Sequence, residues 1–81
     1  MPSMSVGLYR LPAGGTDLQS PHKQDEVYYV VAGRAKLQGA AEIKDAHPGA
    51  VLFVEAGEQH KFVDIEYDLE LFVFFAPAEQ N

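Results

Sequence analysis

Two short segments of the sequence carry the side chains that could bind a metal ion. His22 precedes Glu26 by four positions, and His60 lies in a second segment that begins at Gly49. Two imidazoles and one carboxylate form a ligand set for a divalent first-row transition metal and leave coordination positions open for water or substrate. Fe(II), Zn²⁺, Ni²⁺ and Mn²⁺ all suit this set, so the residue types alone do not fix the metal.

The spacing of the first segment sets a condition on such a site. On an extended strand His22, Gln24 and Glu26 would point to one face, but His22 and Glu26 would lie roughly 13 Å apart. One ion could contact both only if the chain bends between them, and Pro21 with the polar stretch after it favours an irregular approach. The side-chain oxygen of Gln24 is a weaker candidate for an additional ligand. One helical turn started by Ser20 is the local alternative, which the strand-like run after Glu26 disfavours.

The elements that must position these residues read as strands. Gly and Pro recur along the chain, and the runs between them are short and rich in Val, Tyr, Phe and Ile. Such residues favour strands over helices, and frequent turn signals between them predict an all-β sandwich or barrel. The expected strands are 6–11, 27–32, 51–54, 60–65 and 69–75.

Three aromatic residues accompany the candidate ligands. Tyr28 shares a strand face with Glu26, and Phe62 shares one with His60. We expect Tyr28, Phe62 and Phe53 to fill the core or line a pocket. His47 reads as a surface turn residue without a role, and Asp64 as a turn former at a strand end.

The composition excludes several classes of function. The 81 residues make one domain, residues 1–81. A net charge of −6 with scattered basic residues argues against nucleic-acid and anionic-membrane partners. There is no cysteine, no apolar run long enough to span a bilayer and no visible signal peptide, so a cytoplasmic protein is expected.

The last expected strand predicts a partner subunit. Residues 71–75 leave no polar face, whereas an antiparallel strand with one solvated face normally alternates. We therefore expect a homodimer with this strand, or the neighbouring run 6–11, at the interface.

The two segments resemble the paired motifs of the cupin family. In the first, His22, Glu26 and Gly33 match at the family's spacing, and Ser20 replaces the first histidine of the H-x-H pair. In the second, Gly49, Gly57 and His60 match, while Glu55 and Asp64 replace the family's Pro and Asn.

The resemblance implies a small double-stranded β-helix, or jelly-roll barrel, with a metal bound by His22, Glu26 and His60. Three functions fit that implication: a metal-dependent enzyme, such as an oxygenase or isomerase acting on a small organic molecule; a module that binds a small molecule or metal without turnover; and a metal-free dimeric barrel. No catalytic residue beyond the ligands is indicated, because a fold alone does not define a reaction.

Overall fold

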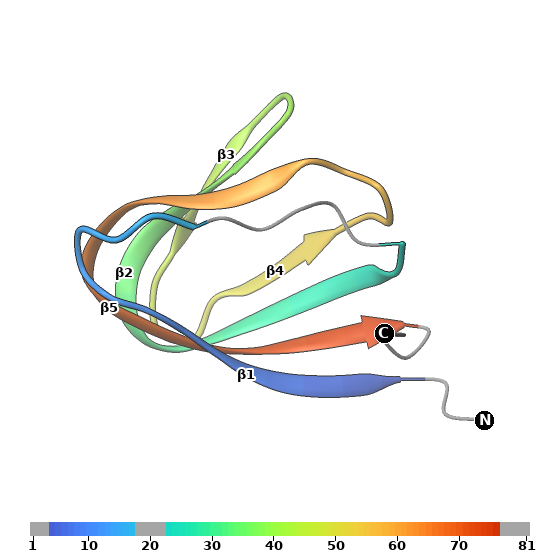
Figure 1. Cartoon of the computed structure of the whole chain (residues 1–81), viewed down its shortest axis with the longest axis horizontal. Coiled ribbons are helices and arrows are strands. Elements are labelled where there is room, and N and C mark those ends of the chain that lie inside the picture. The colour runs from blue at the N-terminus through green and yellow to red at the C-terminus, as the bar shows by residue number, and fades with distance from the viewer. Residues whose placement is uncertain (1–3, 18–22, 77–81) are drawn as a thin grey trace.

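The chain folds into antiparallel strands that curve around one interior (Figure 1). The computed structural model describes residues 4–17 and 23–76. Its five strands are β1 (Ser5–Leu11), β2 (Asp25–Gly39), β3 (Ile43–Ala46), β4 (Val51–Val54) and β5 (His60–Ala76). Within the described residues no helix is present that is long and apolar enough to cross a membrane.

The two long strands, β2 and β5, organise the fold. They pair with each other along most of their lengths, and the hydrogen-bonded order is β1-β5-β2-β3, with β4 also paired to β2. The first half of β2 pairs with β4 and the second half with β3. Each long strand therefore contributes to two sheet halves, which face each other across the interior, as in a jelly roll.

Irregular pairing makes this double use possible. The β2–β5 register shifts three times between Val30 and Lys36, and such bulges bend a strand and increase its twist. Gly33 lies in this stretch with a φ of 97°, and a Cβ there would come within 2.3 Å of the Asp68 carbonyl oxygen. On the opposite strand Asp64 has a φ of 49°. Only glycine fits the first position, because the two backbones approach too closely for a side chain.

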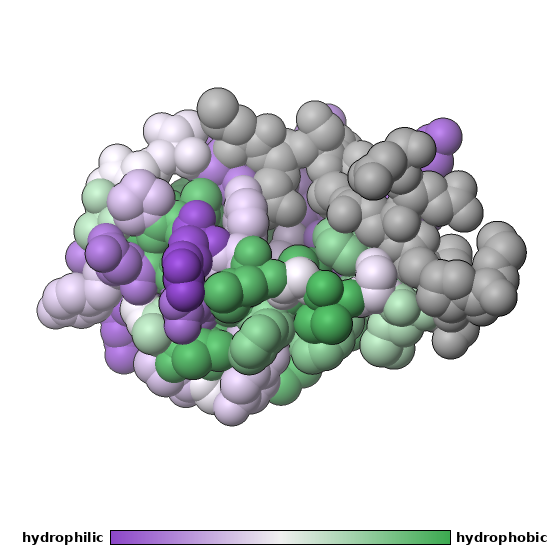
Figure 2. Space-filling model, turned by 60° about the horizontal axis from the view of Figure 1, so that its bottom comes forward, coloured by the Kyte–Doolittle hydropathy of each residue, from purple (hydrophilic) through white to green (hydrophobic). Residues whose placement is uncertain are grey.

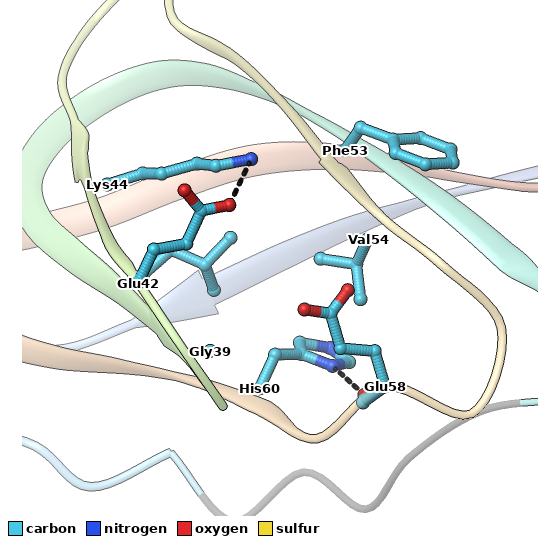
Figure 3. A pocket seen from close by; sticks show the side chains of 8 residues that line it. Gly39, Glu42, Lys44, Phe53, Val54, Glu58 and His60 are labelled. Carbon is cyan, nitrogen blue, oxygen red and sulfur yellow. Dashed lines mark hydrogen bonds and ion pairs between the residues drawn. The ribbon is translucent and has the colours of Figure 1, made fainter.

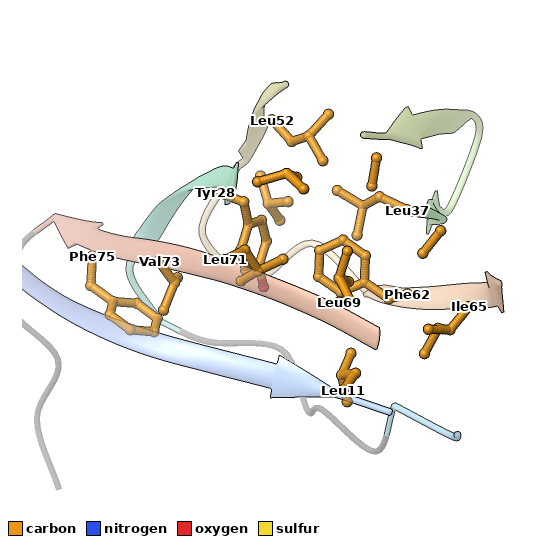
Figure 4. Close-up of a cluster of buried hydrophobic side chains, with 14 residues drawn as sticks. Leu11, Tyr28, Leu37, Leu52, Phe62, Ile65, Leu69, Leu71, Val73 and Phe75 are labelled. Carbon is orange, nitrogen blue, oxygen red and sulfur yellow. The ribbon is translucent and has the colours of Figure 1, made fainter. Parts of the chain in front are cut away.

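The interior is filled by one hydrophobic cluster drawn from every strand (Figure 4). Tyr28, Val30 and Leu71 are fully buried in it, and Phe62 and Leu69 are 1% exposed. Alternation along β5 places residues 69, 71, 73 and 75 inside, as expected when one face of an antiparallel sheet covers the core.

The all-β prediction is confirmed, while several boundaries were wrong. The runs 60–65 and 69–75 are one strand, because Asp64 does not end it but takes a left-handed conformation within it. Gly33 likewise lies inside β2 rather than after it. Strand β3 was not predicted, since its sequence Ile-Lys-Asp-Ala has little strand character.

Candidate functional site

A buried carboxylate meets a buried imidazole in the barrel interior. Glu26 is the second residue of β2 and points inward like Tyr28, whereas His60 opens β5 and points inward from the other half of the sheet. His60 Nε2 lies 3.2 Å from Glu26 Oε2, and each side chain is only 1% exposed. The structure thus brings together two of the three ligands predicted from sequence, from positions 34 residues apart.

Tyr28 joins the pair. Its hydroxyl donates to Glu26 Oε1 at 3.0 Å and lies 3.0 Å from His60 Nε2. The Tyr28 ring packs edge-on against Phe62, with ring centroids 5.1 Å apart. Edge-to-face packing and full burial fix the direction of the hydroxyl, so Tyr28 is part of the site as well as of the core.

Hydrogen bonding fixes one proton of the imidazole. His60 Nδ1 lies 3.0 Å from the carbonyl oxygen of Glu58, which can only accept, so Nδ1 carries a proton. In the neutral ring, Nε2 then presents a lone pair toward Glu26 and Tyr28. In the protonated ring, Nε2 donates to Glu26 instead, and the carboxylate accepts from both neighbours.

These donors fit a divalent metal. Ligand bonds of about 2.0–2.2 Å to a transition metal place two neighbouring ligand atoms on one ion about 3 Å apart, close to the separation of His60 Nε2 and Glu26 Oε2. A backbone carbonyl holding the far ring nitrogen is also the common support for a metal-binding histidine.

The third predicted ligand cannot be placed. His22, with Ser20 and Pro21, lies outside the described residues. Over the ranges 4–17 and 23–76, no group of three His, Cys, Asp or Glu residues is arranged to hold an ion. Gln24, the candidate additional ligand, is buried at 8% exposure and stands two positions before Glu26.

A small pocket reaches His60 from the surface (Figure 3). Its volume is about 30 Å³, enough for no more than a few water molecules. Lys44 lies at the rim, paired with Glu42 at 3.5 Å, and Phe53 and Glu58 also contribute to the wall. Phe53 is 49% exposed, so of the three aromatic candidates it lines the pocket but does not belong to the core.

Sequence reasoning missed a second buried carboxylate, Asp17. It accepts from the Tyr9 hydroxyl and from the backbone N–H of Phe62, both at 2.8 Å. Burial, followed by this hydrogen bond and the nearby negative charge, raises the pKa of Tyr9 well above its ordinary value. The hydrogen bond from the Phe62 N–H connects Asp17, which precedes the first motif, to β5, the strand that carries His60. No sequence signal marks this role, since a lone Asp after Gly-Thr reads as a loop residue.

A small antiparallel barrel with a carboxylate–imidazole centre defines the class of this protein. The family model of the cupin domain matches residues 7–75, so the chain belongs to the cupin family. The family resemblance noted in the sequence is therefore confirmed, together with the barrel fold.

Relatives are found both in sequence and in structure. An uncharacterized protein of Streptomyces coelicolor is 52% identical over 77 residues, covering 95% of this chain and 73% of the relative. The structure of KdgF from Halomonas has a TM-score of 0.85 at 21% identity, covering 98% of this chain and 74% of that one. The DMSP lyase DddQ from Ruegeria pomeroyi has a TM-score of 0.86 at 21% identity, covering 94% of this chain.

The matches cover different shares of the matched proteins. The chain spans 39% of the length of the lyase and less than two thirds of several other solved structures that it matches. At such identities the structural likeness carries the fold, and not a substrate or a reaction.

Proposed function

We propose that this cupin binds one divalent first-row transition metal ion through His60 Nε2 and the carboxylate of Glu26, with His22 as the third ligand and Gln24 as an additional one. The observation that carries the proposal is the buried pair itself, in which two donors lie 3.2 Å apart inside a barrel. Fe, Zn, Ni and Mn remain the candidate metals, since all accept imidazole and carboxylate ligands.

The surroundings of the pair support this function. The Glu58 carbonyl holds His60 in the tautomer whose Nε2 lone pair faces Glu26. Neutral imidazole is the form that binds metals, so binding takes up that lone pair and displaces any proton there. Tyr28 donates to the other carboxylate oxygen and so leaves Oε2 for the ion.

A bound ion would act as a Lewis acid toward a small organic molecule or oxygen at its remaining coordination positions. The pocket at His60 gives the side of access. Tyr28 is the residue of this chain that could hold a proton beside a bound molecule, because its hydroxyl donates to Glu26 Oε1 and lies 3.0 Å from His60 Nε2. We extend the proposal to a metal-dependent enzyme, an oxygenase or isomerase; binding without turnover is the alternative use of the same site. Structural neighbours that include a DMSP lyase support an enzyme in general and no particular substrate.

A metal-free barrel is the second candidate, and one observation favours it. Among the described residues, no buried side-chain nitrogen or oxygen lacks a hydrogen-bond partner. A protonated His60 between Glu26 and the Glu58 carbonyl would satisfy the site without an ion. Such a buried ion pair would be a structural feature only.

Metal analysis of the purified protein separates the candidates. We expect near-stoichiometric metal in the unmodified chain and in His47→Ala, whose exposed imidazole serves as the matched control. His60→Ala and Glu26→Gln should lose the metal. Because binding to the folded state raises the unfolding temperature, added metal should stabilise the first two proteins and leave the variants unchanged.

Two results would contradict the metal proposal. One is near-stoichiometric metal in the double variant His22→Ala, His60→Ala. The other is an unmodified chain that stays metal-free and shows no thermal shift with Fe(II), Zn²⁺, Ni²⁺ or Mn²⁺, which would select the metal-free barrel.

A further inference from the structure

The chain that follows β1 runs beside the first half of β5. Strand β1 pairs with β5 as far as Leu11, which lies opposite Leu69. Beyond that point residues 12–17, which we call the connecting segment, continue along β5 (Figure 1). Three hydrogen bonds of 2.8–2.9 Å attach the segment to β5, at the Asp68 side chain, the Ile65 carbonyl and the Phe62 N–H. At the first two the segment donates from its backbone, whereas at Phe62 the side chain of Asp17 accepts.

Asp17 is a buried carboxylate next to the candidate site. It is 4% exposed, and it accepts from the Tyr9 hydroxyl as well as from the Phe62 N–H. A buried charge is costly, and a neutral oxygen could also accept from that N–H, so the two donors must compensate for the carboxylate. Burial first, then Asp17, and also the charge of Glu26 raise the pKa of Tyr9. The pair of Tyr9 and Asp17 thus lies within electrostatic reach of Glu26.

Phe62 links Asp17 to the candidate site in two ways. Along β5 it follows His60 by two positions, and both side chains point inward. Across the interior its ring packs edge-on against Tyr28, with ring centroids 5.1 Å apart (Figure 4). The Tyr28 hydroxyl in turn donates to Glu26. A displacement of the Phe62 backbone would therefore move both the imidazole and the hydroxyl that meet at the carboxylate.

We propose that Asp17 is a positioning residue of the candidate metal site: by holding the Phe62 N–H it keeps His60 Nε2 directed at Glu26. The inference rests on the proposed function, which makes His60 and Glu26 ligands. Groups that orient metal ligands from behind typically contribute about 10–100-fold to metal affinity. The Glu58 carbonyl orients the ring of His60 directly, and Asp17 acts through the backbone of the strand that carries it.

Nuclear magnetic resonance of the metal-free chain tests this positioning. The nitrogen and proton shifts of the His60 ring report its tautomer and its contacts, and the signals absent from His60→Ala identify that ring. Asp17→Ala removes the acceptor of the Phe62 N–H and should shift these signals. Asp17→Asn keeps an oxygen for that N–H, and its amide can donate to the Tyr9 hydroxyl, so the signals should be those of the unmodified chain.

Asp68→Ala is the matched control. It also removes a carboxylate that accepts a backbone N–H at 2.8 Å between the connecting segment and β5, but at an exposed position. Its His60 signals should equal those of the unmodified chain. Urea unfolding of each variant measures the stability lost, and a purely stabilising role of Asp17 predicts unchanged ring signals in the folded variant. Asp17→Ser, which shortens the side chain but keeps a polar atom, takes the place of Asp17→Ala if the latter does not fold.

Titration with Zn²⁺ gives a second result. We expect Asp17→Ala to bind Zn²⁺ at least about tenfold more weakly than the unmodified chain, and Asp17→Asn and Asp68→Ala to bind it equally well. Unchanged His60 signals on removal of the Asp17 carboxylate, or an equal change in Asp68→Ala, would overturn the proposal. An unmodified chain without affinity for the candidate metals would refute the proposed function instead, and the ring signals would still decide whether Asp17 positions His60.

Discussion

His60 is held by contacts from two separate parts of the chain. Its Nδ1 is bonded to the Glu58 carbonyl in the preceding turn, and its Nε2 faces Glu26 and Tyr28 from β2. The turn therefore sets the tautomer and the sheet sets the environment. The chemistry of His60 therefore depends on the turn and on the sheet. Substitutions at Glu26 or Tyr28 should alter that chemistry while the imidazole itself is unchanged.

The proposed metal site predicts a dependence on pH. Protons compete with the ion for His60 Nε2, so metal affinity should fall as the pH is lowered from about 8 to about 5. Isothermal titration with Zn²⁺ across this range measures the effect. Imidazole ligation would be excluded by an affinity that stays constant.

Tyr28→Phe tests the hydroxyl that joins the two ligands. The variant keeps the ring that packs against Phe62 but loses the donor to Glu26. Removing one buried hydrogen bond should lower the free energy of unfolding by about 1–2 kcal/mol. We also expect a change in metal affinity, measured by titration, since the Glu26 oxygens gain freedom. An unaltered stability would show that the hydroxyl does not hold the site.

Tyr9 gives the folded state a sensitivity to alkaline pH. Because burial and Asp17 raise the pKa of Tyr9, its hydroxyl keeps its proton in the folded chain after it has been lost in the unfolded one. The contribution of protonated Tyr9 to the free energy of unfolding is fully present below about pH 10. It is lost as the pH rises beyond that value. Urea unfolding at increasing pH should show this loss in the unmodified chain and a smaller one in Tyr9→Phe. Equal slopes in the two proteins would contradict this account.

At the scale of elements, β2 and β5 determine where the site forms. Only their bulged middle sections allow one strand pair to supply both sheet halves, so that Glu26 and His60 face each other. At Gly33 the backbones of the two strands approach so closely that a Cβ would meet the Asp68 carbonyl oxygen. A side chain added at Gly33 would therefore disturb the pairing of β2 with β5, on which the whole barrel depends, and not only one turn.

Gly33→Ala measures this constraint, with Gly49→Ala as its control. Both glycines have φ near 90°, but no atom lies within 4 Å of a Cβ at Gly49. We expect Gly49→Ala to cost about 1–2 kcal/mol from backbone strain, and Gly33→Ala about 3 kcal/mol or more because the Asp68 carbonyl must also move. Chemical denaturation provides the two values. Similar losses would mean that the close approach carries no cost of its own.

In the molecule as a whole, the two faces of one sheet half differ in what they expose. The inner face holds the candidate site and the core, whereas the outer face exposes large apolar side chains, among them Leu8, Val51 and Phe53. Figure 2 shows hydrophobic residues gathered on the side of the molecule that carries β1. An 81-residue chain buries a thin core, so a partner subunit would add a substantial share of its stability.

A dimer whose folding is coupled to association has an unfolding temperature that rises with concentration. We expect this rise in the unmodified chain, because the apolar run 71–75 predicts a homodimer, and not in Phe72→Lys, which places a charge at a 40% exposed position of that run. Calorimetry over a hundredfold dilution measures the difference. A concentration-independent transition in the unmodified chain would contradict the coupling.

Local sequence features predicted the strand character, the family and two residues of the candidate site. The Val, Tyr, Phe and Ile content of the short runs and the recurrence of Gly and Pro between them act through local chain propensity, so the all-β barrel and strand β4 could be predicted. The spacing from Gly49 to His60 and the placement of Glu26 identified two residues that do meet. The roles of His22, Glu26, His60 and Gln24 as metal ligands stay predictions, as do the metal and the dimer.

Which residues face each other follows from the folded arrangement of the strands and could not be predicted. The run 71–75 has no polar face, and sequence could not tell its inner residues from Phe72 and Phe74, because both sets are apolar. The burial of Asp17, the contact of Tyr28 with both site residues and the need for glycine at 33 depend on chain segments distant in sequence. Such long-range pairings are set by packing and register, which local composition does not encode.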